Sequence, residues 1–200
     1  MDDNWLTLLN SLPKPFRFGE AIAIGIHRDT LRRLKKSGRV EQLSRGLYQV
    51  AGTGELMQPD LSLVFRKVPD AVLCLISALY FHGLGTQIPH EIFIAIPRKS
   101  NIPRIDYPPT RIFRITEACF SEGIETHRID NRTIHVYSRP RTVVECFKYR
   151  HKIGFDVALE ALKEFRKQPD FQLSQILWFA RYLRMDRVIR PYLEMLTLTS

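Results

Sequence analysis

A run of basic side chains between residues 28 and 45 has the composition of a surface that binds a polyanion. Seven Lys or Arg residues lie in this segment, against two acids, Asp29 and Glu41. Seven bases less two acids leave +5 of the formal net charge of +9 in eighteen residues. Guanidinium and ammonium groups bind phosphate oxygens, and Arg with short polar side chains also reads base edges. The chemistry indicated is recognition of a polyanion, such as nucleic acid, an acidic protein or a membrane surface.

The residues just before and within this segment have the spacing of a helix-turn-helix. Ala21 is small enough for two helices to pack closely, and Gly25 follows it four residues later, where a turn requires a conformation that is costly for other residues. Ile26, Leu31 and Leu34 then have the helical spacing that directs them toward a core. We therefore expect helices over residues 18–24 and 28–37, with the second one as the recognition helix.

The polar face of that second helix carries the predicted DNA contacts. A hairpin of two short strands, residues 40–43 and 47–50, follows the helix and is predicted to form a wing with Arg45 at its tip. The predicted base contacts are Arg28, Thr30 and Arg32, while His27 either caps the helix or touches a base. The predicted phosphate contacts are Arg33, Lys35, Lys36 and Arg45, and Arg39 either joins them or pairs with Glu41.

The whole chain is predicted to be α+β, with two domains. Residues 1–52 form the winged helix-turn-helix, whose first helix covers the apolar residues between 5 and 12. Residues 58–200 form a larger α+β domain with a small sheet and a helical C-terminus. Helices are expected over 60–68, 71–82 and most of 140–200. Strands are expected over 91–96, 111–115, 124–129 and 133–137, the last two as a hairpin around Asp130-Asn131.

Enzyme and metal motifs are absent from the sequence. His90-Glu91 begins like a zinc-protease motif, but Ile94 stands where its second histidine is needed. No phosphate-binding loop, nucleophile elbow or acid-x-lysine triplet occurs. His127 and His135 could share a metal only if a three-residue loop, rather than a two-residue turn, joined their strands. We therefore predict no catalytic residue, no metal and no cofactor.

Membrane insertion and export are not expected either. No apolar run approaches the length that spans a bilayer. The three cysteines have no metal-binding or disulfide spacing, and Cys146 is predicted to be a small core residue. A cytoplasmic protein is expected.

Strings distributed along nearly the whole chain resemble the AbiEi family of antitoxins. In chain order these are residues 17–50, ending in Ser44-Arg45-Gly46-Leu47-Tyr48, then Cys74–Leu79 with His82-Gly83-Leu84, Thr86–His90, Ile94–Arg98, Tyr107-Pro108-Pro109, Val136–Ser138, Thr142–Val144, Cys146–Arg150 and Arg190–Leu193. The resemblance implies an antitoxin whose partner toxin is a nucleotidyltransferase. It also implies an N-terminal domain that represses its own promoter at inverted repeats, which makes self-association on DNA a further expectation, and a C-terminal domain that counters the toxin.

Two further sets of basic residues are candidates for contact with DNA or toxin. The first comprises Arg139, Arg141, Lys148 and Arg150. The second comprises Arg181, Arg184 and Arg187, whose spacing predicts that they share one side of a helix. Two alternatives to the antitoxin remain. One is a transcriptional regulator with a ligand- or protein-binding second domain, and the other is a divergent nuclease or transferase fused to a winged helix.

Overall fold

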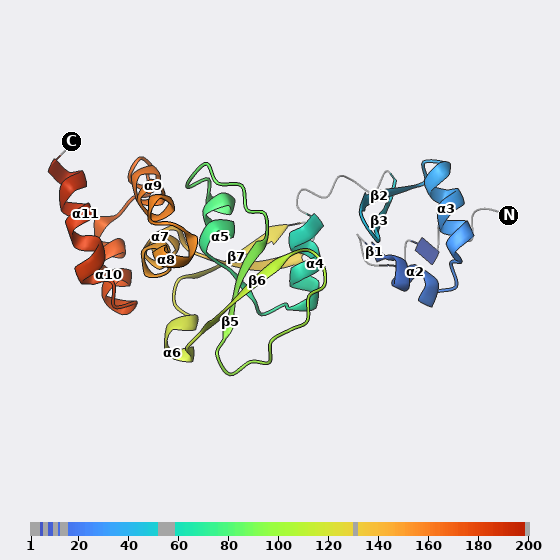
Figure 1. The fold of residues 1–200 in the computed structure, drawn as a ribbon, viewed down its shortest axis with the longest axis horizontal. Coiled ribbons are helices and arrows are strands. Elements are labelled where there is room, and N and C mark those ends of the chain that lie inside the picture. The colour runs from blue at the N-terminus through green and yellow to red at the C-terminus, as the bar shows by residue number, and fades with distance from the viewer. Residues whose placement is uncertain are drawn as a thin grey trace. The chain divides into compact units, whose positions relative to one another are not determined.

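The computed structural model describes residues 5, 8–9, 12, 16–51, 59–129 and 132–198, without the side chains of residues 43, 44, 59 and 196–198. The chain divides into two compact units, Met1–Leu63 and Val64–Ser200, and the division falls within a helix, α4 (Pro59–Lys67). Figure 1 shows the elements of both units along the chain. Each unit has its own hydrophobic core.

The N-terminal unit is a winged helix-turn-helix. Its described elements are β1 (Phe16–Arg17), α2 (Phe18–Ala23), α3 (Arg28–Lys36), β2 (Val40–Ser44) and β3 (Leu47–Val50). The strands form an antiparallel sheet in the order β1-β3-β2. The two expected helices and the wing are confirmed. Of the expected first helix, Trp5, Leu8 and Leu9 are helical, and its remaining residues apart from Leu12 lie outside the described part of the chain.

Strand β1 was not expected from the sequence. Two residues are too few to show an alternation, and Pro15 precedes them. Phe16 nevertheless pairs with Tyr48, and their rings stack with centroids 6.0 Å apart. This strand ties the start of α2 to the wing.

The C-terminal unit is built on a mixed five-stranded sheet. Its strands are β4 (Val72–Leu73), β5 (Ile92–Pro97), β6 (Thr110–Ile115), β7 (Ile124–Ile129) and β8 (Arg132–Tyr137), in the order β6-β5-β4-β8-β7. Strand β4 pairs antiparallel with β5 and parallel with β8, while β5 and β6 are parallel. The expected strands and the β7–β8 hairpin are confirmed, and the α+β class holds for the chain.

The central strand β4 corrects the prediction of one helix over residues 71–82. The segment starts as strand and becomes α5 (Leu75–His82) only after Cys74. Val72 and Leu73 are each 1% exposed because the strand is covered on both faces. A strand buried on both faces has no polar alternation, so its sequence cannot be distinguished from that of a buried helix.

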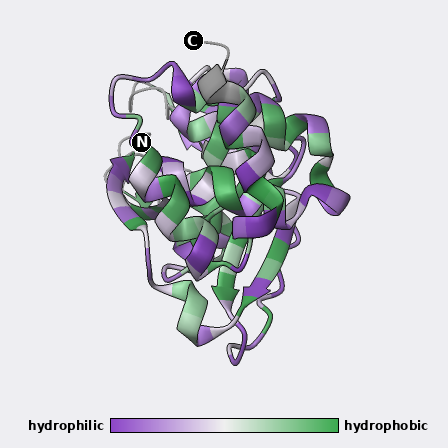
Figure 2. Ribbon diagram, turned by 90° about the vertical axis from the view of Figure 1, so that its left-hand side faces the viewer, coloured by the Kyte–Doolittle hydropathy of each residue, from purple (hydrophilic) through white to green (hydrophobic). Residues whose placement is uncertain are grey.

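Helices make up the remainder of the C-terminal unit. They are α6 (Glu117–Phe120), α7 (Arg139–Lys148), α8 (Arg150–Ile153), α9 (Phe155–Arg166), α10 (Leu173–Tyr182) and α11 (Asp186–Leu198). Figure 2 shows hydrophobic and hydrophilic residues mixed within these helices, as expected where one side of a helix is packed and the other is open to solvent. No helix in the described part of the chain has the length and apolarity needed to cross a membrane.

Candidate nucleic-acid interface

The turn between α2 and α3 has the geometry that the sequence predicted. Ala21 and Ile26 are fully buried, and the backbone N–H of Ile26 donates to the carbonyl of Ala21 at 2.9 Å. Gly25 has a φ of 90°, in the left-handed region that favours glycine. Leu31 and Leu34 are 2% and 7% exposed and anchor α3 to the core. The helix-turn-helix is thus positioned by packing on one side of α3.

The ends of the two helices are stabilised differently. Glu20 in the first turn of α2 accepts a hydrogen bond from the backbone N–H of Arg17 at 2.7 Å, which closes that end of the helix. His27 occupies the N-cap position of α3, but its side chain makes no capping hydrogen bond. His27 is exposed. Of its two predicted roles, a helix cap and a contact with a base, the second is therefore the one that fits.

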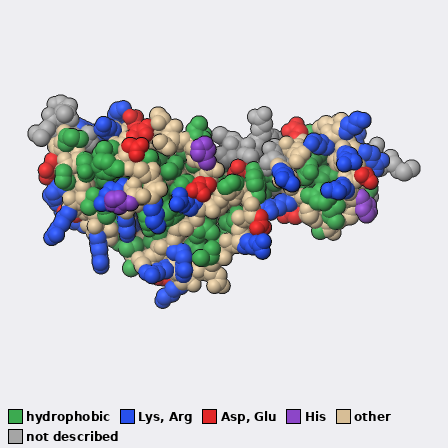
Figure 3. Space-filling view, in the orientation of Figure 1, with side chains coloured by type: hydrophobic (Ala, Val, Ile, Leu, Met, Phe, Trp, Pro, Cys, Tyr) green, Lys and Arg blue, Asp and Glu red, His purple; other side chains and the backbone are tan. Residues whose placement is uncertain are grey.

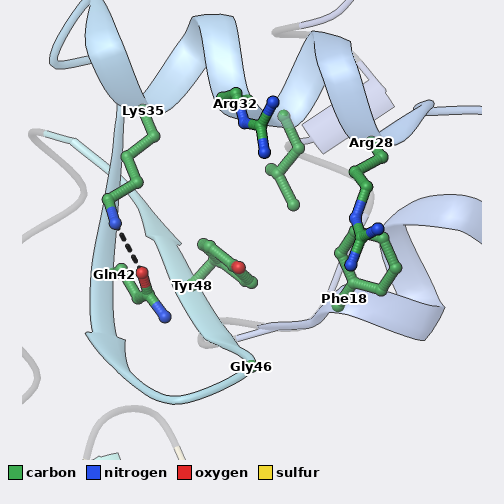
Figure 4. Close-up of a pocket in the computed structure, with 8 residues that line it drawn as sticks. Phe18, Arg28, Arg32, Lys35, Gln42, Gly46 and Tyr48 are labelled. Carbon is green, nitrogen blue, oxygen red and sulfur yellow. Dashed lines mark hydrogen bonds between the residues drawn. The ribbon is translucent and has the colours of Figure 1, made fainter.

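One side of α3 faces the wing across a groove of about 410 Å³. Arg28, Arg32 and Lys35 come from the helix, and Figure 4 shows Lys35 reaching the wing residue Gln42 while Arg28 lies against Phe18. Lys35 Nζ donates to Gln42 Oε1 at 2.5 Å. The guanidinium carbon of Arg28 lies 5.8 Å from the ring centroid of Phe18, which also lines the groove. Cations therefore occupy one wall of a groove whose other wall offers an amide and a phenol.

The other side of α3 borders a second groove, of about 310 Å³. Arg33 and Arg39 line it together with Trp5 and Ser37. Within the described residues, Arg33 makes no hydrogen bond or ion pair, and the same is true of Arg32 and Lys36. These cations are available to an external anion.

Thr30 corrects the predicted set of base contacts. Its side chain is 7% exposed, on the side of α3 that also carries Leu31 and Leu34. Thr30 stands one position before Leu31, and in a helix of 3.6 residues per turn the buried stripe is wide enough to include it. Thr30 touches the second groove but exposes almost none of its side chain, so it is removed from the predicted base contacts.

The wing presents its turn to solvent. Arg45 is exposed between β2 and β3, and Gly46 has a φ of 78° that closes the turn. The register between the strands shifts between Gln42 and Ser44, which bends the hairpin near its tip. In the space-filling view, Lys and Arg side chains gather over the N-terminal unit (Figure 3). Arg45 thus extends the cationic surface beyond the helix.

Most side chains of the first basic set of the C-terminal unit make contacts within the protein. Arg141 contradicts the prediction that it contacts DNA or toxin. Arg141 is fully buried, with its guanidinium 3.6 Å from the Tyr137 ring centroid and donating to the carbonyls of Glu122 and Cys119 at 2.5 and 2.6 Å. It cannot contact DNA or a partner. The others are Arg139, which pairs with Asp170 at 2.6 Å, Arg150, which donates to the carbonyl of Phe147 at 2.8 Å, and Lys148, which is exposed.

The second basic set does not lie along one helix as predicted. Arg181 belongs to α10 and Arg187 to α11, whereas Arg184 lies in the turn between them with a φ of 60°. All three are exposed. Because the helix breaks at this turn, their three-residue spacing does not place them on a common helical side.

Comparison with known proteins identifies the N-terminal segment. Residues 6–51 match the family model described as a transcriptional regulator, AbiEi antitoxin. The match is confined to the N-terminal unit. No curated protein matches the sequence. A crystal structure of the RV2827C protein from Mycobacterium tuberculosis is similar in fold, with a TM-score of 0.54 and 17% sequence identity over 89% of this chain and 70% of that one.

Three residues on the surface of the N-terminal unit are not among the site residues that the sequence predicts. Gln42 and Tyr48 line the groove beside the wing, and Asp29 lies exposed on α3 among the cations. The strand alternation of the wing could have indicated the side of Gln42 and Tyr48. From the sequence, Asp29 is notable only as an acidic residue that lowers the net positive charge of residues 28–45.

In the C-terminal unit, burial shifts the pKa of several side chains. Burial raises the pKa of the Cys74 and Cys146 thiols, which keeps them protonated core residues as predicted for Cys146. Burial lowers the pKa of His82, whose Nε2 lies 2.7 Å from the carbonyl oxygen of Tyr137. Burial also raises the pKa of Glu145 to about 7, although Arg141 3.9 Å away opposes this.

The two hairpin histidines lie on opposite faces of their strands. Ile129 pairs with Arg132, and the register places His135 opposite Thr126 rather than opposite His127. This is the arrangement of a two-residue turn. Among the described residues, no group of three or more His, Cys, Asp or Glu side chains could hold a metal ion.

Proposed function

We propose that this protein is the antitoxin of a two-gene toxin–antitoxin system and represses its own operon. In this proposal, residues 1–52 bind an inverted-repeat operator in the cytoplasm, and residues 58–200 counter a nucleotidyltransferase toxin without catalysing a reaction. The observation that carries the DNA-binding half is the exposed cationic side of α3, held beside the wing by a core that buries the other side.

The physical argument is one of complementarity. A recognition helix enters the major groove while the wing reaches the adjacent backbone, so cations are needed along the helix and at the wing tip. Arg28, Arg32 and Lys35 border the groove, and Arg45 lies at the tip. An anionic DNA duplex would contact the cations of the helix and the cation at the wing tip at the same time. The family match of residues 6–51 supports the same conclusion independently.

DNA binding and repression are tested with the DNA upstream of the protein's own gene. The full-length chain should retard this duplex in a gel-shift assay and reduce expression of a reporter placed behind it. Arg32→Ala/Lys36→Ala should abolish both effects because these two exposed cations have no hydrogen bond or ion pair with any described residue. Absence of salt-sensitive duplex binding by the wild-type chain would remove this half of the proposal.

The antitoxin half is tested by co-expression with the product of the adjacent gene. The full-length chain should restore growth, and the Arg32→Ala/Lys36→Ala variant should do so too when both genes are expressed from foreign promoters, because the countering role is assigned to the other unit. Failure of the full-length chain to restore growth would leave a regulator without antitoxin activity. Cleavage of nucleic acid by the purified chain with magnesium or manganese would contradict the absence of catalysis.

A further inference from the structure

An acidic side chain lies in the middle of the cationic side of α3. Asp29 is exposed, in the first turn of the helix, at the end that approaches base edges in a helix-turn-helix. The buried side of α3 consists of Thr30, Leu31 and Leu34. Residues three and four apart are neighbours on a helix surface, so Asp29 adjoins Arg32 and Arg33 on the side opposite the core.

Among the described residues, no cation neutralises the carboxylate of Asp29. Although Arg32 and Arg33 stand at the spacings that form helical ion pairs, Asp29 has no ion pair or hydrogen bond to any described residue. An unpaired carboxylate on this surface repels the phosphates that the neighbouring cations attract. The carboxylate therefore weakens binding to DNA of any sequence. It favours a complex only where it accepts a hydrogen bond from a specific donor on the DNA.

The chemistry of the base edges identifies that role. An ionised carboxylate only accepts hydrogen bonds. In the major groove, guanine presents two acceptors, and thymine presents an acceptor and a methyl group. Adenine places its N7 acceptor beside its amino donor, where it repels a carboxylate, whereas cytosine presents its N4 amine as a donor without such a neighbour. Cytosine is the base that suits Asp29.

We propose that Asp29 accepts a hydrogen bond from the N4 amine of a cytosine and makes this position of the operator specific. The inference rests on the proposed DNA binding. Asp29 and Arg32 are three residues apart, which is about 4.5 Å along a helix that rises about 1.5 Å per residue. Base pairs are spaced at about 3.4 Å. The cytosine thus lies within one or two base pairs of the base that Arg32 reads, for which guanine is the usual partner of Arg.

The test is selection from a duplex library with a randomised central segment, using the full-length wild-type chain, Asp29→Asn, Asp29→Ala and Arg32→Ala. The wild type should enrich a sequence with a cytosine preferred about fivefold or more at one position per half-site, the effect of a single good base contact. Asp29→Asn should replace that cytosine by adenine, because Asn pairs bidentately with adenine N6 and N7. Asp29→Ala should leave the position without preference, and both variants should bind an unselected duplex more tightly than the wild type.

The outcomes separate this inference from the function on which it rests. A wild-type chain that enriches nothing and shows no salt-sensitive duplex binding overturns the proposed function itself. A wild-type motif that Asp29→Asn and Asp29→Ala both reproduce unchanged overturns only the role of Asp29. The role of Asp29 is also overturned if its variants change the preferred base only at the position that Arg32→Ala alters. Asp29 would then act only by positioning Arg32. Circular dichroism of each variant checks that α3 is intact.

Discussion

The salt dependence of DNA binding is the most quantitative consequence of the cationic surface. Four side chains are assigned to phosphates: Arg33, Lys35, Lys36 and Arg45. Each phosphate neutralised on duplex DNA contributes about −0.9 to the slope of log affinity against log salt, so four contacts give a slope of about −3.6 per N-terminal unit bound. Raising the salt concentration from about 50 to about 200 mM should then weaken binding about 150-fold.

Arg33→Ala and Lys36→Ala are the sharpest perturbations of this slope. Both side chains are exposed and make no internal contact within the described residues, so their removal should leave the fold unchanged. Each variant should reduce the slope by about 0.9, and the same increase in salt should then weaken binding only about 40-fold. Arg32→Ala should instead lower affinity for the selected sequence and change the slope little, because Arg32 is assigned to a base.

Fluorescence anisotropy of a labelled duplex at several salt concentrations measures both quantities. Lys163→Ala is the matched control, since Lys163 is an exposed cation on α9 of the other unit. Its slope and affinity should equal those of the wild type. If Arg33→Ala and Lys36→Ala kept the wild-type slope, or if Lys163→Ala changed it equally, α3 would not be the phosphate-binding surface.

Three further predictions concern buried or strained positions in the two units. Thr30→Val should leave DNA affinity and the salt slope within about twofold of wild type in the same assay, since Thr30 is buried; a large loss of affinity would contradict its removal from the contact set. Gly25→Ala should destabilise the N-terminal unit by about 1–2 kcal/mol in thermal unfolding, because the φ of 90° is strained for alanine although its Cβ would meet no atom within 4 Å; an unchanged melting temperature would refute this reasoning. Glu145→Gln should remove a loss of stability with pH: the raised pKa of Glu145 contributes stability that is complete below pH 4.5 and is lost as the pH rises to about 7, by at most about 3 kcal/mol. Urea denaturation at pH 5 and pH 8 should therefore favour the Gln variant increasingly at the higher pH, and a difference independent of pH would count against the assignment.

The second unit shows where reasoning from basic residues fails. Arg141 and its neighbours have the composition of a binding surface, yet Arg141 lies on Tyr137 and bonds to two carbonyls. Arg can be fully buried when its donors are satisfied and its plane stacks on an aromatic ring. A count of charges along the chain does not distinguish such an arginine from a solvated one, because the two carbonyls that it bonds come from a segment about twenty residues away.

Local sequence determined most of the N-terminal unit. The positions of Ala21, Gly25 and Ile26 define the turn, since a glycine at positive φ and small or branched apolar neighbours are requirements of the backbone within a few residues. The wing follows from the same local rules, and so does the placement of Arg32 and Lys35 on an exposed side of α3.

Only the tertiary structure decided which residues at the edges of these patterns are buried. Thr30 adjoins the apolar stripe and is covered, whereas Asp29 beside it stays exposed among cations and pairs with no residue that the structure describes. Strand β4 is a strand because β5 and β8 flank it, and strand β1 exists because β3 offers it hydrogen bonds. These outcomes depend on partners that are distant along the chain. The type and spacing of a side chain do not show which distant segments will pack against it.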